Sequence, residues 1–208
     1  MAFGRWIGRA IGISLDVRNK ELIPEKNAVF LVNHQSILDM VIVANLIPDR
    51  CIILTKRSLL WTLPGFALAV YLCGHRMINR KKKERDIKSL RRAVEEMVSK
   101  NICLLVYPEG QRKIGPTLQP FKRAAFHMAV QSKFPIVPIV VSSYNFVMNY
   151  SSCSKIGNTF IVHVLPIIET KDKTEDDVPN LCSQTYEIMN ETFENMTAAI
   201  EKELEEFE

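Results

Sequence analysis

Residues 28–39, AVFLVNHQSILD, contain the pattern from which the fold class of this chain can be inferred. A short continuous run of apolar residues ends in Asn33 and His34, and such a run predicts a buried strand. The apolar stretch that begins at Ile37 predicts a helix. Ser36 and Asp39 have the spacing of a capping box, with Asp in place of the more usual Glu or Gln. The segment therefore predicts a strand, a tight turn and a helix.

The same alternation continues along the 208 residues. Further strands are predicted at 51–55, 76–79, 102–107, 135–141 and 159–166, and helices at 84–100, 121–132 and 181–207. Near-continuous apolar strands separated by helices predict an α/β fold with a central, mostly parallel sheet flanked by helices. The length suits a single domain.

We divide the chain into an N-terminal segment, 1–15, and a domain, 16–208, in which a charged linker at 170–180 precedes the last helix. The N-terminal segment mixes arginines with Trp and Ile, which predicts an interfacial, membrane-associating stretch. A second uncharged stretch, 58–74, is slightly short for a membrane crossing. We interpret it as a buried or interfacial helix pair.

Charge is distributed unevenly. Residues 1–140 contain 23 Lys and Arg against 10 Asp and Glu, whereas residues 141–208 contain 4 against 13. A basic main body favours anionic partners such as a membrane surface or phosphorylated substrates. Nucleic acid is a weak alternative, because no nucleic-acid motif is present. Five dispersed cysteines without metal-ligand spacing favour a reducing compartment and predict no metal site.

His34 and Asp39 permit two interpretations. In the structural one, Ser36 caps a helix and the histidine only ends a strand. In the chemical one, His34 is a base and Asp39 is the carboxylate that orients it. The start of the helix would also supply backbone donors for a developing oxyanion. The spacing alone leaves both interpretations open.

Two further blocks contain candidate ligands for an anion. In VYPEGQR, Glu109 and Arg112 follow a buried strand, at the edge where open α/β sheets bind ligands. Lys122 and Arg123 are predicted to begin the next helix, whose N-terminus favours anions. Arg80, at the end of GHRMINR, could reach the same edge.

Together with IVPIVVSSY (136–144), these blocks resemble the four ordered motifs of the glycerolipid acyltransferases, in particular the lysophosphatidic acid acyltransferases. NHQSILD is similar to the first motif, GHRMINR to the second, YPEGQR to the third and IVPIVVSSY to the fourth. The resemblance extends from about residue 15 to residue 168. It departs from the usual pattern at Met77, Asn79, Gln111 and Ala124.

The resemblance implies an enzyme that transfers an acyl group from acyl-CoA to the sn-2 hydroxyl of lysophosphatidic acid, giving phosphatidic acid and CoA. His34 would be the general base and Asp39 would orient it, with direct attack on the thioester. Arg80, Glu109, Gly110, Arg112 and Lys122 would bind the substrate. Acyl-CoA would be a co-substrate, with no other cofactor and no metal. The implied location is the endoplasmic reticulum membrane, with the site facing the cytosol or the interface.

Two kinds of alternative accompany this interpretation, another acceptor or no catalysis. The acceptor could be glycerol 3-phosphate, lysophosphatidylcholine or a lysocardiolipin. The departures from the family pattern lie around the expected substrate site and bear on this choice. The chain could also be a truncated, non-catalytic lipid-binding protein on the same fold.

Overall fold

The computed structural model of the chain describes residues 12, 14–25, 27–36, 38–44, 46–48, 51–53, 76–77, 83–146 and 159–206. Within them lies a seven-stranded sheet with the order β1-β7-β6-β2-β5-β3-β4. The strands are β1 (Ser14–Arg18), β2 (Val29–Val32), β3 (Cys51–Ile53), β4 (Arg76–Met77), β5 (Cys103–Val106), β6 (Ile136–Val141) and β7 (Thr159–Val164). Five of them, from β6 to β4, are mutually parallel. The predicted α/β fold with a mostly parallel sheet is confirmed.

Apolar strands of the central sheet bury both of their faces. In β2, Val29 and Leu31 belong to one core, whereas Phe30 and Val32 belong to the other. This division follows from the alternation of side chains along a strand. The sheet therefore separates two hydrophobic cores, which explains why its strands are continuous apolar runs rather than alternating ones.

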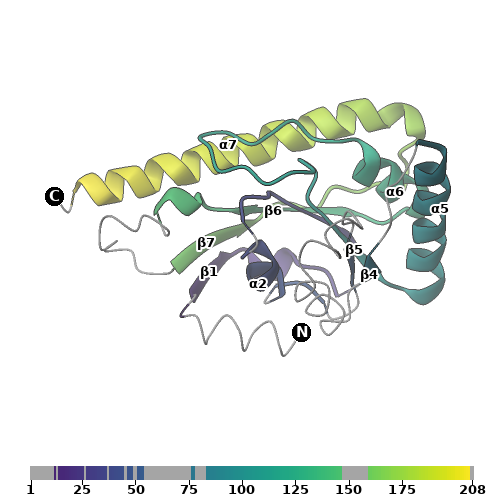
Figure 1. Cartoon of the computed structure of the whole chain (residues 1–208), viewed down its shortest axis with the longest axis horizontal. Helices are drawn as coiled ribbons and strands as arrows, with labels where there is room; N and C mark the ends of the chain where they lie inside the picture. Colours follow the sequence, from purple (N-terminus) through teal and green to yellow (C-terminus); the bar gives the residue numbers. More distant parts are fainter. Residues whose placement is uncertain are drawn as a thin grey trace.

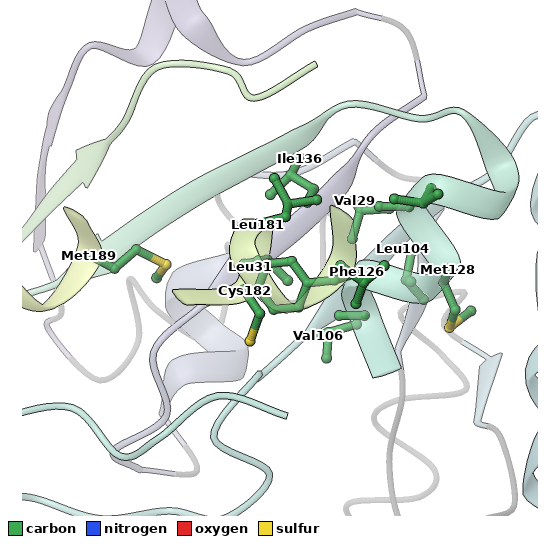
Figure 2. Close-up of a cluster of buried hydrophobic side chains, with 14 of the residues drawn as sticks. Val29, Leu31, Leu104, Val106, Phe126, Met128, Ile136, Leu181, Cys182 and Met189 are labelled. Carbon is green, nitrogen blue, oxygen red and sulfur yellow. The ribbon is translucent and has the colours of Figure 1, made fainter. Parts of the chain in front are cut away.

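Helices cover the first of these faces. α5 (Lys83–Lys100), α6 (Ala124–Ser132) and α7 (Val178–Glu205) all contribute side chains to the core that contains Val29 and Leu31. Figure 2 shows Leu181 and Cys182 of α7 among side chains of the sheet and α6, with Met189 of the same core farther along the helix. α7 runs along the length of the sheet as the longest element in the fold (Figure 1).

The opposite face is covered by shorter elements. Ile42 and Val43 of α2 (Asp39–Ala44) belong to the core that contains Phe30 and Val32. Leu22, from the 3-10 helix η1 (Lys20–Leu22), packs against the same core. The remaining 3-10 helices are η2 (Tyr144–Phe146) and η3 (Glu175–Asp177). This face therefore places the beginning of α2 beside the strand end that holds His34.

The sheet differs from the prediction at one edge. β1 was not predicted, and its first residues, Ser14 and Leu15, lie in the stretch assigned to the N-terminal segment. β1 pairs in parallel with β7, and β7 pairs antiparallel with β6. The two strands at this edge therefore run against the other five.

The last helix begins earlier than predicted, inside the expected linker. Thr174 and Asp177 form a capping box, with the Thr174 N–H 2.7 Å from Asp177 Oδ2. η3 follows directly, and α7 then starts at Val178. Pro179 lies in the first turn of α7, where a helix does not need its N–H. The second half of the expected linker, from Glu175 onward, is therefore helical and leads into α7.

Candidate active site

Three strand ends meet at one edge of the sheet. β2 lies between β6 and β5, and all three are parallel, so their carboxyl ends point the same way. His34 follows β2, Glu109 follows β5, and Tyr144 follows β6. The parallel register thus brings together the first, third and fourth sequence blocks.

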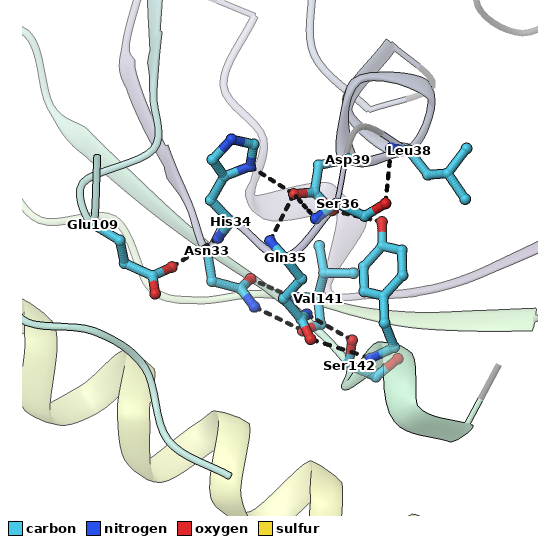
Figure 3. A network of polar contacts seen from close by, with 10 residues as sticks. Asn33, His34, Gln35, Ser36, Leu38, Asp39, Glu109, Val141 and Ser142 are labelled. Carbon is cyan, nitrogen blue, oxygen red and sulfur yellow. Dashed lines mark hydrogen bonds and ion pairs between the residues drawn. The ribbon is translucent and has the colours of Figure 1, made fainter. Parts of the chain in front are cut away.

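His34 and Asp39 form a hydrogen-bonded pair. His34 Nδ1 lies 2.7 Å from Asp39 Oδ2. The Asp39 side chain is fully buried, whereas that of His34 is 19% exposed. Figure 3 shows the second ring nitrogen of His34 pointing away from this network. The pair has the arrangement that the chemical interpretation requires.

The carboxylate of Asp39 accepts three more hydrogen bonds. Oδ2 also accepts the backbone N–H groups of Gln35 and Ser36, at 2.8 and 3.0 Å. Oδ1 accepts the hydroxyl of Tyr144 at 2.5 Å. Burial, and then the charge of Asp39, raise the pKa of Tyr144, so the hydroxyl stays a donor. Both oxygens of Asp39 are thus occupied by groups that can only donate here, so the carboxylate acts as an acceptor.

This network determines the tautomer of His34. A charged Asp39 can only accept, so Nδ1 must carry the proton and donate it. In the neutral ring, Nε2 then has a free lone pair, which is the requirement for a general base. Tyr107 stacks on the imidazole, with ring centroids 4.0 Å apart and planes at 17°. The hydrogen bond to Asp39 therefore fixes the orientation of the ring, and Tyr107 packs against one of its faces.

Asn33 and Gln35 connect this turn to the end of β6. Asn33 donates to the carbonyl of Val141 at 3.0 Å and accepts the N–H of Val141 at 2.8 Å. Gln35 donates to the carbonyl of Ser142 at 2.9 Å and accepts the N–H of Tyr144 at 3.1 Å. These amides continue the strand pairing beyond β2, which explains why polar side chains are buried on both sides of His34 (Figure 3).

Glu109 connects the turn to the loop after β5. One carboxylate oxygen accepts the N–H of His34 at 2.7 Å, and the other accepts the N–H of Gln119 at 2.9 Å. Burial raises the pKa of Glu109, while the two backbone donors act in the opposite direction. The carboxylate thus holds the His34 backbone in place. Its predicted contact with substrate stays a prediction.

Gly110, Arg112 and Lys122 lie in the segment that follows Glu109 along the chain. Gly110 has φ of 71°, a conformation that favours glycine, and the Lys122 side chain lies directly against it. Arg112 is exposed, and the next N–H, that of Lys113, donates to the His34 carbonyl at 3.0 Å. Two of the predicted cations therefore lie in the segments around His34. Arg80 lies outside the described residues, as do the stretches 1–11 and 58–74.

The expectation that the start of α2 supplies backbone donors for an oxyanion stays a prediction, while the N–H groups of Gln35 and Ser36, in the turn before that helix, donate to Asp39. The expected start of the helix after Glu109 is wrong. α6 begins at Ala124, so Lys122 precedes the helix. Ser36 accepts the N–H of Leu38 at 3.3 Å, as expected for a cap, although the helix itself begins only at Asp39.

Tyr107 and Tyr144 are the site residues that sequence reasoning missed. Each follows an apolar strand, so its position was consistent with a strand end and gave no sign of its contacts. Tyr144 lies 105 positions from Asp39 along the chain.

Among the described residues, no cluster of three or more His, Cys, Asp or Glu side chains could hold a metal ion. The helices of the described residues include none with the length and hydropathy of a membrane span.

Fold and site together define an α/β protein with a partly exposed histidine, hydrogen-bonded to a buried aspartate, at the carboxyl edge of its sheet. A sequence model of the family described as Acyltransferase matches residues 14–142. The chain belongs to the acyltransferase family. The predicted resemblance, and with it the assignment to enzymes that transfer acyl groups, is confirmed.

Named relatives resemble the chain over most of its length. It is 37% identical over 183 residues to the human 1-acyl-sn-glycerol-3-phosphate acyltransferase beta, covering 88% of this chain and 66% of that protein. It is 30% identical to the 1-acyl-sn-glycerol-3-phosphate acyltransferase of Salmonella typhimurium, covering 99% of this chain and 83% of that one.

A solved structure shares the fold. The LPA acyltransferase PlsC from Thermotoga maritima superposes with a TM-score of 0.72 at 19% identity, over 93% of this chain and 76% of that one.

Proposed function

We propose that the chain transfers an acyl group from acyl-CoA to the sn-2 hydroxyl of lysophosphatidic acid, giving phosphatidic acid and CoA. The observation that carries this proposal is the contact between His34 and Asp39 in a member of the acyltransferase family. The names of the relatives support the acceptor, since they specify a 1-acyl-sn-glycerol 3-phosphate. A non-catalytic lipid-binding role would give no reason for an oriented, partly exposed imidazole.

In the proposed reaction, His34 Nε2 accepts the proton of the acceptor hydroxyl. The hydroxyl oxygen of the acceptor attacks the thioester carbonyl of acyl-CoA at the same time. Asp39 stabilises the imidazolium that forms. The tetrahedral intermediate collapses, the carbon–sulfur bond breaks, and the proton passes from His34 to the leaving thiolate of CoA. No acyl-enzyme is needed, which agrees with Ser36 serving as a cap.

Cations near this edge are proposed to bind the acceptor phosphate. Arg112 and Lys122 are exposed within the segments around Glu109 and Gly110, and a guanidinium grips phosphate oxygens in pairs. Arg80 is proposed as the third cation. Because the proposed substrates are lipids, we propose that the chain works at a membrane surface, that of the endoplasmic reticulum.

An acceptor panel tests the substrate. The purified chain in detergent would be given oleoyl-CoA with lysophosphatidic acid, glycerol 3-phosphate, lysophosphatidylcholine or monolysocardiolipin, and CoA release would be measured. We expect the highest kcat/KM with lysophosphatidic acid. A preference for another acceptor would contradict the substrate, and lipid binding without turnover on any acceptor would favour the non-catalytic role.

His34→Ala tests the base. Removing a general base should lower kcat about 10²- to 10⁴-fold while lipid binding and the melting temperature stay near those of the wild type. Asp39→Asn should also lower kcat, and in addition stability, because an amide cannot accept all four hydrogen bonds. His127→Ala is the matched control, since that histidine lies on α6 and bonds to Glu175. Unchanged turnover in His34→Ala would exclude His34 as the base.

A further inference from the structure

The segment between β5 and α6 rests along α7 (Figure 1). Its contact with the helix centres on Leu118, which is buried. The Leu118 N–H donates to Asn190 Oδ1 at 2.9 Å, and its carbonyl accepts the Tyr186 hydroxyl at 3.2 Å. Two side chains from successive turns of α7 therefore hold both backbone polar groups of one loop residue.

Neighbouring contacts fix the orientation of these two side chains. Asn190 Nδ2 donates to Glu194 Oε1 at 2.8 Å, which directs the amide oxygen toward Leu118. The Tyr186 ring meets Phe121 edge to face, with centroids 5.2 Å apart and planes at 86°. The loop is thus held by directional contacts rather than by apolar packing alone.

The residue after Leu118, Gln119, is connected to the candidate active site by hydrogen bonds. Gln119 donates its backbone N–H to one oxygen of Glu109, and the other oxygen of Glu109 accepts the N–H of His34. A continuous series of backbone and side-chain contacts therefore joins Asn190, on the last helix, to the backbone of the proposed base.

We propose that Asn190, assisted by Tyr186, is a positioning residue for the active site, acting through Leu118, Gln119 and Glu109 on His34. The effect on catalysis rests on the acyltransferase function proposed above. α7 lies wholly outside residues 14–142, the part of the chain that the family model matches. The last helix, α7, would thus help to position the active site in addition to covering the sheet.

A packing role alone does not account for Asn190. Met189 and Phe193, its neighbours on α7, are buried in the core and anchor the helix to the sheet without it. Without the Asn190 oxygen, the N–H of buried Leu118 would lose its acceptor, and an unsatisfied buried donor is costly. The loop would then move to solvate that N–H, carrying Gln119 away from Glu109.

Four variants test the proposal: Asn190→Ala, Tyr186→Phe, the double variant Asn190→Asp with Glu194→Gln, and Asn195→Ala. The double variant keeps an oxygen acceptor for Leu118 and reverses the donor and acceptor within α7. Asn195→Ala is the matched control, an exposed asparagine on the same helix. Each would be assayed well below its melting temperature for kcat and KM, and by hydrogen–deuterium exchange across residues 115–121.

For Asn190→Ala we expect faster exchange at 115–121 and a kcat about tenfold lower, the size of effect that one net hydrogen bond can have on a rate. The KM for acyl-CoA should stay near that of the wild type. Tyr186→Phe should act in the same direction but less strongly. The double variant should restore both exchange and kcat, and Asn195→Ala should match the wild type.

A lower melting temperature in Asn190→Ala, with exchange and kcat equal to those of Asn195→Ala, would overturn the proposal. So would failure of the double variant to restore exchange. If the wild-type chain turned over no acceptor, the proposed function would fail, and exchange at residues 115–121 would still decide whether Asn190 holds the loop.

Discussion

At the scale of single residues, Asp39 joins the beginning of a helix to the candidate site. Its carboxylate is fully buried, and a buried charge without partners is strongly unfavourable. Here four donors satisfy it: two backbone N–H groups of the turn, the His34 ring and the Tyr144 hydroxyl. One carboxylate therefore closes the turn, as the structural interpretation expects, and also holds the imidazole in the arrangement that the chemical interpretation requires.

Tyr144→Phe tests the most distant of these donors. The variant removes the 2.5 Å bond to Asp39 and leaves the ring in place. Because hydrogen bonds to charged groups contribute about 1.5–3 kcal/mol, we expect the free energy of unfolding to fall by that amount and kcat to fall about tenfold. Urea unfolding and CoA release measure the two effects.

A double-mutant cycle isolates the contact between Tyr144 and Asp39. In an Asp39→Asn background, Tyr144→Phe should cost much less stability than in the wild type, because its charged partner is absent. Equal costs in both backgrounds would mean that the hydroxyl stabilises the fold independently of Asp39.

At the scale of elements, the reversed pair β1 and β7 forms one edge of the sheet. Leu15 and Val17 of β1 face the core, whereas Asp16 and Arg18 are exposed. That alternation is typical of a half-buried strand. The sequence interpretation instead grouped the beginning of this stretch with the arginine-rich residues before it. Arg18 is in register with His163 of β7.

This pairing predicts a pH effect. Burial, and then the charge of Arg18, lower the pKa of His163, with Asp16 acting in the opposite direction. As pH falls through about 6.5, the ordinary pKa of histidine, the unfolded chain binds a proton that the folded chain does not, so stability is lost. Arg18→Gln should raise the pKa of His163 and reduce that loss.

An NMR titration of His163 and melting curves at about pH 7.5 and 5.5, values on either side of the ordinary histidine pKa, measure both quantities. Lys100→Gln, at the end of α5, is the control for loss of one positive charge. If the pKa of His163 did not respond to Arg18→Gln, the charge of Arg18 would not be a cause of the shift.

At the scale of the whole molecule, the sheet separates two cores. Phe126, on α6, lies in the core covered by α5, α6 and α7, and Phe160, on β7, lies in the opposite core. Both side chains are essentially inaccessible to solvent. Because interiors are close-packed, each core responds mainly to its own side chains.

Phe126→Leu and Phe160→Leu test this separation. Each should lower the free energy of unfolding by about 1–2 kcal/mol, and the double variant should equal their sum to within about 0.5 kcal/mol. Phe126→Leu combined with Leu181→Ala, two residues of one core (Figure 2), should depart from additivity by more. Strong coupling across the sheet in urea unfolding would contradict the independence of the two cores.

Much of the fold was predictable because apolar periodicity is local. Each predicted strand for which residues are described is present, and the helices differ mainly at their first turns, where capping decides the start. His34 and Glu109 were also singled out from their positions after strands, and Asp39 from its spacing at a helix start. Local sequence patterns alone thus establish the α/β class, the strand positions and the polar residues at the carboxyl edge.

The partners of those polar groups depend instead on how the elements pack. Tyr144 reaches Asp39 because β6 lies beside β2, and Asn190 reaches Leu118 because α7 lies across the same face as the loop. Glu109 bonds to two backbone N–H groups that no periodicity could indicate. Hydrogen bonds between segments distant in sequence depend on strand order and helix placement, which only the packing of the whole chain establishes.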